Sequence, residues 1–256
     1  MKKTLLILVV CTVSVIFAVL CIFGGGKKEA NTISFAGSGG YPPFNFILDD
    51  GSVDGFDVDV AKEIAKRLGK QEQYVTTSWD GIIEGLRAGR YDGILGSMAI
   101  TEDRLQVVDF SSPYYFSGPQ LIVRKDSGLT DISDFTEDHV IALVTGTTFE
   151  KDAEKAGLKF KLYEDDNQTL MELINGRVDG VLTDRIVGLN AMSKMKGGDN
   201  LTIAGSVLRT ESMGIAFKKN SALTEQVNAA LKAMREDGTL RAISEKWFPG
   251  EDITVE

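Results

Sequence analysis

The segment GRYDGIL occupies residues 89–95, and GRVDGVL occupies residues 176–182. Five of the seven residues are identical, and the two copies begin 87 positions apart. In each copy a glycine follows a helical pattern and an apolar segment follows the turn, which predicts a helix end, a turn and a buried strand. Such turns are common in α/β proteins, so the residues around the copies decide what the repetition means.

Strand and helix patterns alternate around both copies. The expected strands are 32–36, 93–96, 140–144, 160–163 and 180–182. The expected helices are 58–68, 82–86 with Asp80 as its cap, 149–156 and 170–174. This alternation is typical of mostly parallel sheets that are flanked by helices, so we expect two α/β lobes.

Residues 1–30 have the composition of a secretory leader with a linker. Lys2 and Lys3 precede an apolar run from residue 5 to residue 23, and glycines and lysines follow. A cleaved signal peptide is the preferred interpretation. The run is also long enough to span a bilayer as a membrane anchor, and Cys21 is a candidate for lipid attachment, although the bulky Leu20 precedes it. The protein is therefore expected to cross the inner membrane and to be periplasmic or tethered to the outer face of the membrane.

The rest of the chain argues against several classes of function. Removing residues 1–30 takes away a net charge of +3 and changes the formal charge from −9 to −12, which disfavours nucleic acid as a partner. Both cysteines, Cys11 and Cys21, lie in the leader, and His139 is the only histidine. We therefore expect no disulfide, no metal site and no cofactor in the mature chain. Catalysis by a Ser-His or Cys-His pair is also not expected.

The stretch after the first copy, GSMAITEDR at 96–104, predicts a carboxylate site. In an open α/β sheet, ligands bind beyond the carboxyl ends of the strands. Thr101 is placed to cap a short helix, and Arg104 follows one turn later, so a hydroxyl, backbone N–H groups and a guanidinium converge. The local alternative is an ordinary helix cap beside a surface arginine.

The second copy leads to Asp184, which offers an anion at the equivalent strand end, unless it only caps the following helix. A cation in one lobe and an anion in the other suit a zwitterion held between them. Tyr41 and Trp79 are expected on loops at the same sheet edge, where they can stack on a ligand or cover a cationic nitrogen. Each aromatic residue alone is more often ordinary packing. Thr147 and Thr148 add donors from the second lobe.

Several short segments resemble one known family in their order along the chain. They are YPPF at 41–44, GFDVD at 55–59, ITEDR at 100–104, DFSSPYY at 109–115, GTT at 146–148, GIA at 214–216 and KWF at 246–248. Together they resemble the polar amino-acid family of bacterial extracellular solute-binding proteins, which serve ATP-driven importers. The resemblance covers about residues 32–249.

The resemblance implies an α/β, two-lobed periplasmic-binding-protein-like fold of type II with two hinge crossings, near 114–119 and 205–210. Lobe 1 is then 31–116 plus 209–256, and lobe 2 is 117–208. It implies a monomer that closes on a free L-amino acid and delivers it to the membrane permease of an ABC importer.

The family's site can be transferred residue by residue. Arg104, assisted by Thr101 and the backbone of Ala99, resembles the residue that binds the α-carboxylate. Asp184 resembles the residue that binds the α-amino group, and Thr148 lies where the second lobe reaches the carboxylate. The expected ligand-binding residues are Ser38, Tyr41, Trp79, Gly96, Ser97, Ala99, Thr101, Arg104, Val144, Thr148 and Asp184, with no catalytic residue and no metal ligand.

Three positions bear on the ligand. Ala99 stands where many members of the family have a hydroxyl. Ser38 stands where members that bind glutamine or basic amino acids often have aspartate, and Val144 stands where a polar contact sometimes occurs. These residues favour a neutral, polar amino acid.

Two alternatives stand beside the binding protein. The same fold is found in enzymes similar to cyclohexadienyl dehydratase, which need a general acid in the cleft, and Glu150 is the nearest candidate. The other alternative is a ligand-sensing module that acts through a separate receptor.

Overall fold

The computed structural model describes residues 31–256, and its large compact unit is Ile33–Glu256. The predicted leader lies outside the described residues. Within the described part of the chain, no helix combines the length and the apolar character that crossing a membrane requires.

The first sheet has six strands in the order β5-β1-β6-β14-β7, with β8 paired to β14. Its strands are β1 (Thr32–Gly37), β5 (Gln71–Thr76), β6 (Gly93–Ala99), β7 (Val108–Phe110), β8 (Tyr115–Ser117) and β14 (Glu211–Lys218). Strands β1 and β6 are parallel, whereas β14 runs antiparallel to β6, β7 and β8. The helices of this part are α2 (Phe56–Arg67), α3 (Ile82–Ala88), α4 (Glu102–Val107), α8 (Ala222–Glu236) and α9 (Thr239–Trp247).

The second sheet has five strands in the order β11-β10-β12-β9-β13. Its strands are β9 (Pro119–Arg124), β10 (Val140–Val144), β11 (Lys159–Tyr163), β12 (Gly180–Asp184) and β13 (Leu201–Ala204). Strand β10 is parallel to β11 and β12, and β9 is antiparallel to β12 and β13. Its helices are α5 (Phe149–Lys155), α6 (Asp166–Ile174) and α7 (Arg185–Lys194), with the 3₁₀ turns η1 (Ile132–Asp134) and η2 (Gly198–Asn200).

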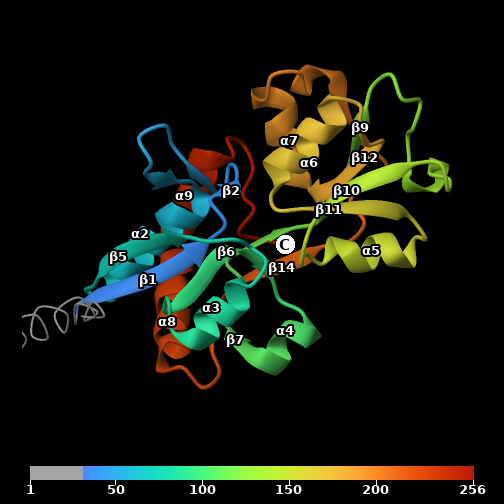
Figure 1. Ribbon diagram of the computed structural model, residues 1–256. Coiled ribbons are helices and arrows are strands. Elements are labelled where there is room, and N and C mark those ends of the chain that lie inside the picture. Colours follow the sequence, from blue (N-terminus) through green and yellow to red (C-terminus); the bar gives the residue numbers. More distant parts are fainter. Residues whose placement is uncertain (1–30) are drawn as a thin grey trace, which may run out of the picture. The chain divides into compact units, whose positions relative to one another are not determined.

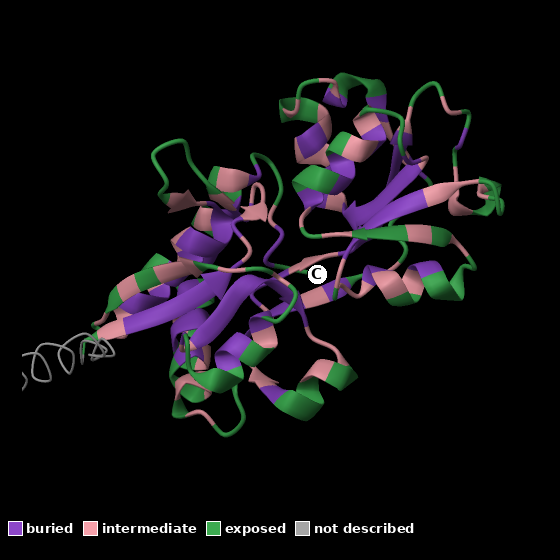
Figure 2. Cartoon of the chain, viewed as in Figure 1, coloured by how far each residue is buried: buried purple, intermediate pink, exposed green. Residues whose placement is uncertain are grey.

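We call the first sheet with its helices the first lobe and the second sheet with its helices the second lobe (Figure 1). A small sheet of β2 (Gly40–Tyr41), β3 (Asn45–Ile47) and β4 (Val53–Asp54) belongs to the first lobe. The chain passes from the first sheet to the second between β8 and β9, and it returns between β13 and β14. Figure 2 shows that the central strands of both sheets are buried while the outer faces of the helices are exposed. The predicted two-lobed α/β fold is confirmed, with antiparallel strands added to each parallel core.

The two copies of the repeated sequence form the same backbone turn. Gly89 ends α3 at φ 79°, and Gly176 follows α6 at φ 70°. In the first copy, Gly89 N–H donates to Leu86 O and Arg90 N–H to Gly85 O. In the second, Gly176 N–H donates to Leu173 O and Arg177 N–H to Glu172 O. This pair of bonds defines a Schellman motif, in which glycine adopts the left-handed conformation at no steric cost.

The shared aspartate of the repeat attaches each turn to the parallel neighbour of the strand that follows it, which is β1 beside β6 and β10 beside β12. Asp92 Oδ2 accepts the N–H of Ser34 in β1 at 2.9 Å, and Asp179 Oδ2 accepts the N–H of Val140 in β10 at 2.8 Å. All residues of β6 and β12 are buried, as the apolar segments predicted.

One local prediction was wrong. Helix α3 begins after Gly81, which lies at φ 86°, and no side chain caps it. A left-handed glycine turn therefore starts this helix in place of the expected cap by Asp80.

Candidate functional site

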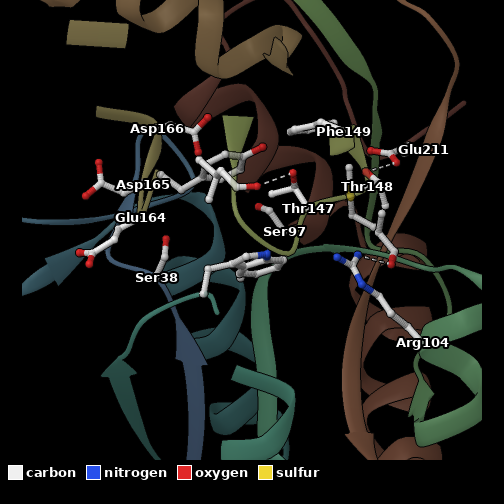
Figure 3. Close-up of a pocket in the computed structure, with 16 residues that line it drawn as sticks. Ser38, Ser97, Arg104, Thr147, Thr148, Phe149, Glu164, Asp165, Asp166 and Glu211 are labelled. Carbon is white, nitrogen blue, oxygen red and sulfur yellow. Dashed lines mark hydrogen bonds between the residues drawn. The ribbon is translucent and has the colours of Figure 1, made fainter. Parts of the chain in front are cut away.

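A cavity lies at the carboxyl ends of the parallel strands and is lined by residues of both lobes (Figure 3). The lining residues of the first lobe are Ser38, Tyr41, Trp79, Gly96, Ser97, Ala99, Arg104, Glu211 and Met213. Those of the second lobe are Val144, Thr147, Thr148, Phe149, Glu164, Asp165 and Asp166. The arrangement follows from the fold, because the ends of β1, β6, β10 and β11 lead into these loops.

Nine of the eleven residues expected in the site line this cavity, namely Ser38, Tyr41, Trp79, Gly96, Ser97, Ala99, Arg104, Val144 and Thr148. Thr101 and Asp184 do not line it. Thr101 Oγ1 accepts the N–H of Arg104 at 3.3 Å and so caps α4, as the sequence predicted. It therefore positions the arginine.

Arg104 reaches across the cavity from the start of α4. Its Nη1 donates to Ala99 O in the same lobe at 2.9 Å, and its Nη2 donates to Gly146 O in the second lobe at 3.2 Å. The guanidinium carbon lies 5.7 Å from the centre of the Trp79 ring, within the range of a cation–π interaction. Burial lowers the pKa of Arg104, and the carboxylate of Glu211 opposes that shift. The group stays charged, because an arginine keeps its proton in proteins.

The turn before α5 brings the second lobe to the arginine. Gly146 O also accepts the indole N–H of Trp79 at 3.4 Å. Thr148 Oγ1 donates to Glu211 Oε1 at 2.7 Å, and Lys151 forms an exposed ion pair with Asp103. These bonds join second-lobe residues to first-lobe elements, so the two lobes touch across the cleft in this structure.

Asp184 is fully buried at the end of β12. Its Oδ1 accepts the N–H of Ile186 at 2.8 Å, so the carboxylate does cap α7. Its Oδ2 has no hydrogen bond of ordinary geometry within the described part of the chain, although the nearby Ser117 hydroxyl acts to lower the pKa of this carboxyl. Burial raises the pKa of Asp184 to about 7. Because an unsatisfied buried carboxylate oxygen is costly, the cap alone does not account for this residue.

The hydroxyl of Ser97 is bound within the protein, so this residue offers the cavity its backbone. Its Oγ donates to Asp57 Oδ2 at 3.0 Å, and Asp57 also accepts Asn45 Nδ2 at 2.8 Å and Tyr114 Oη at 2.6 Å. Burial raises the pKa of Asp57 to about 6. Ser97 has a left-handed backbone with φ 59°, and its N–H faces the hydroxyl of Tyr114 at 3.0 Å. This buried network fixes the end of β6.

Six lining residues were not expected from the sequence, namely Phe149, Glu164, Asp165, Asp166, Glu211 and Met213. Thr147 also lines the cavity and was expected to add a donor, although it is not one of the eleven expected binding residues. Glu164, Asp165 and Asp166 directly follow β11, so the rule that placed Arg104 at a strand end could have found them. Thr147 lies in the turn that the sequence already indicated. Glu211 and Met213 come from β14, and the sequence gives no sign that this returning strand pairs with β6.

Comparison with known proteins assigns the class. The chain matches the bacterial extracellular solute-binding proteins, family 3, over residues 33–250, and it belongs to that family.

Among its relatives is the L-cystine-binding protein TcyJ of Escherichia coli strain K12, which is 36% identical over 231 residues, covering 89% of this chain and 86% of the relative. Among solved structures, an ancestral arginine-binding protein bound to glutamine superposes with a TM-score of 0.81 at 36% identity, over 88% of this chain and all of that one. The ancestral amino acid-binding protein AncCDT-1, described as a precursor of cyclohexadienyl dehydratase, gives 0.80 at 33% identity, over 86% and 96%.

Proposed function

We propose that this protein binds one free L-amino acid in the cavity between its lobes and delivers it to the membrane permease of an ABC importer. The observation that carries the proposal is the cavity itself, which is lined by both lobes and faced by Arg104. The family and the amino acids named in its relatives' descriptions support it. The protein would work outside the cytoplasm, in the periplasm or tethered to the membrane, and as a monomer.

Arg104 is proposed to bind the α-carboxylate. The planar guanidinium suits two carboxylate oxygens, and among residues 31–256 its hydrogen bonds go to the peptide carbonyls of Ala99 and Gly146 alone. A ligand carboxylate would replace the weaker acceptor Gly146 O, and it would accept a hydrogen bond from the Thr148 hydroxyl in place of Glu211. Tyr41 and Trp79 line the same cavity and would cover the ligand's carbon chain.

Asp184 is proposed to bind the α-ammonium group through its unpaired Oδ2. A cation beside this buried carboxylate would favour its charged form, which burial disfavours. The zwitterion would then connect a cation of the first lobe with an anion of the second.

Binding would close the lobes because the ligand contacts both of them only in the closed form. We propose that the moving parts are residues 31–116 with 209–256 and residues 117–208. An amino acid has roughly 10 heavy atoms, and the best small ligands gain about −1.5 kcal/mol per atom. Micromolar affinity, about −8 kcal/mol, is therefore within reach without any catalytic step.

The side chain of the ligand is a separate question. Ser38 and Val144 line the cavity and favour a neutral, polar amino acid.

An enzyme of the dehydratase type is the second candidate, and the description of AncCDT-1 is one reason to test it. Glu150 does not line the cavity, and its carboxylate accepts the N–H of Gly146. Asp166 does line the cavity, and burial raises its pKa to about 7, so it is the better candidate for a general acid.

A binding screen tests the proposal. The purified protein is heated with each of the twenty amino acids, L-cystine, prephenate or arogenate, and hits are measured by calorimetry. We expect one or a few amino acids to raise the melting temperature, because a ligand that binds the folded state stabilises it. Conversion of prephenate or arogenate to product, without binding of any amino acid, would replace the proposal by the enzyme.

A further inference from the structure

Three consecutive carboxylates of the second lobe lie at one side of the cavity (Figure 3). Glu164, Asp165 and Asp166 follow β11 and lead into α6. Glu164 is exposed and Asp165 is half-buried, while Asp166 is only 5% exposed. The group therefore extends from solvent into the interior.

The charges that line the cavity do not balance. Arg104 is the one cation among the lining residues of the described chain, whereas Glu164, Asp165, Asp166 and Glu211 are acidic. The negative charge of Glu211 is balanced by Arg209, which does not line the cavity and whose Nη2 lies 2.6 Å from Glu211 Oε1. None of the other three forms an ion pair with a residue that the structure describes.

Asp166 is the member of this group that local structure explains least. Its Oδ1 accepts the hydroxyl of Thr183, and no described residue donates to its Oδ2, although the residue lines the cavity. Thr183 precedes Asp184, whose Oδ2 also lacks a donor. Asp184 Oδ2 is thus fully buried without a donor, whereas Asp166 belongs to the lining of the cavity. One α-ammonium group would compensate only one of these two carboxylates.

Asp165 reaches the first lobe near Ser38. A Cβ placed on Gly40 would lie 3.1 Å from Asp165 Cβ and 3.8 Å from its Oδ2, so this carboxylate lies against the turn that follows β1. Asp165 Oδ1 accepts the N–H of Gln168 at 2.9 Å and caps α6, which accounts for only part of its role. Ser38 and Tyr41 line the cavity from the first lobe and carry no charge, whereas Glu164, Asp165 and Asp166 of the second lobe are acidic.

We propose that Asp166, with Asp165 and Glu164 nearer to solvent, forms a subsite for a second cationic nitrogen of the ligand. The ligand is then an amino acid whose side chain ends in an ammonium or guanidinium group. This inference rests on the proposed function and names the ligand class for the same cavity. It competes with the neutral ligand that Ser38 and Val144 favour.

Matched ligand pairs test the subsite without any mutation. Calorimetry at pH 8 compares L-lysine with L-norleucine and L-ornithine with L-norvaline. We expect at least one second-cation ligand to bind about tenfold or more tightly than its partner, as for a hydrogen bond to a charged group. Tighter binding of the neutral partner in every pair would overturn the subsite and leave the proposed function standing. No binding of any amino acid would contradict the proposed function itself.

Variants then locate the subsite. Asp166→Asn should reduce the preference for the second-cation ligand about tenfold while changing the affinity of its neutral partner less than about threefold. Asp126→Asn makes the same charge change at a side chain that is 86% exposed and should change neither. An equal loss for both ligands in Asp166→Asn would assign Asp166 to the α-ammonium group and overturn the proposal.

If Asp166→Asn does not fold by circular dichroism, the exposed variant Glu164→Gln replaces it. Its expected effect is a loss of about twofold to threefold, confined to the second-cation ligand and removed by 0.5 M salt, because exposed charges are screened. An unchanged affinity at low salt, or an equal loss for the neutral partner, would count against the subsite.

Discussion

The strand ends that follow the two copies of the repeat share a backbone and differ in the charge they offer. After β6 the chain turns into α4 and presents Arg104 to the cavity, whereas after β12 it turns into α7 and buries Asp184 completely. The turns before these two strands each end a helix with the same pair of hydrogen bonds, and in each an aspartate accepts an N–H of the neighbouring parallel strand. The comparison teaches that one local scaffold occurs twice and leads to side chains of opposite charge.

The largest effect should come from removing the cation on one side of the comparison. Arg104→Ala is expected to weaken amino-acid binding about 100-fold or more, because it deletes a bidentate charged donor from a partly buried site. Calorimetry measures the loss, and an unchanged circular dichroism spectrum shows that the fold is intact. Arg87→Ala is the control, since that side chain is 56% exposed. An affinity within threefold of the original would contradict the assignment of Arg104.

Asp184→Asn removes the anion on the other side while keeping an N-cap for α7. Binding of the amino acid should fall about tenfold or more, and binding of its α-hydroxy analogue should change less than about threefold. The difference arises because only the amino acid carries an ammonium group. If the affinities of both ligands fall by the same factor, the role of Asp184 is limited to capping α7.

A change of pH should sharpen the comparison, because the buried acids of the cleft region titrate above their usual range. Burial raises the pKa of Asp166 and Asp184 from 3.8 to about 7, and that of Asp57 to about 6. Between about pH 4 and pH 7 the folded state keeps protons on these carboxyl groups that the unfolded chain has released. The stabilisation of the folded state by the protonated carboxyl groups is therefore complete below about pH 4 and is lost as the pH rises through 7.

Urea unfolding between pH 5 and 8 measures this effect in the ligand-free protein. Asp166→Asn and Asp184→Asn should each show a smaller fall in unfolding free energy over this range than the original protein, because asparagine does not ionise. A ligand ammonium should bind more tightly at the upper end of the range. Identical pH profiles for all three proteins would show that these carboxyl groups do not titrate in this window.

The smallest effect should come from breaking the shared scaffold itself. Asp92→Ala and Asp179→Ala each remove an acceptor from a strand N–H, and each should lower the unfolding free energy by about 1–3 kcal/mol. Urea unfolding of the two variants compares the lobes directly. A loss in one variant with none in the other would mean that the two copies are similar in sequence without being equivalent in stability.

Much of the fold could be predicted from the sequence because its decisive signals are local. Gly89 and Gly176 each follow a helix in the left-handed conformation, and the buried strands after them are short apolar runs. Asp80 shows the limit of that approach, since a left-handed glycine at position 81 starts the helix without a side-chain cap.

The cavity could be predicted only in part, because some of its residues depend on long-range pairing. Trp79 and Arg104 follow from their places in the first lobe. Glu211 reaches the cavity because β14 returns to pair with β6, and no local pattern announces that pairing. Asp166 could have been recognised, since it lies just after a predicted strand in the same way as the expected residues.

The central claim is that the two lobes hold the two charges of one zwitterion. Its most direct test is calorimetry of the unmodified protein with the preferred amino acid, its decarboxylated amine and its deaminated α-hydroxy acid. We predict that the amine and the acid each bind at least about tenfold more weakly than the amino acid, because each lacks one of the two charged contacts. Binding of either analogue with the affinity of the amino acid would contradict the account.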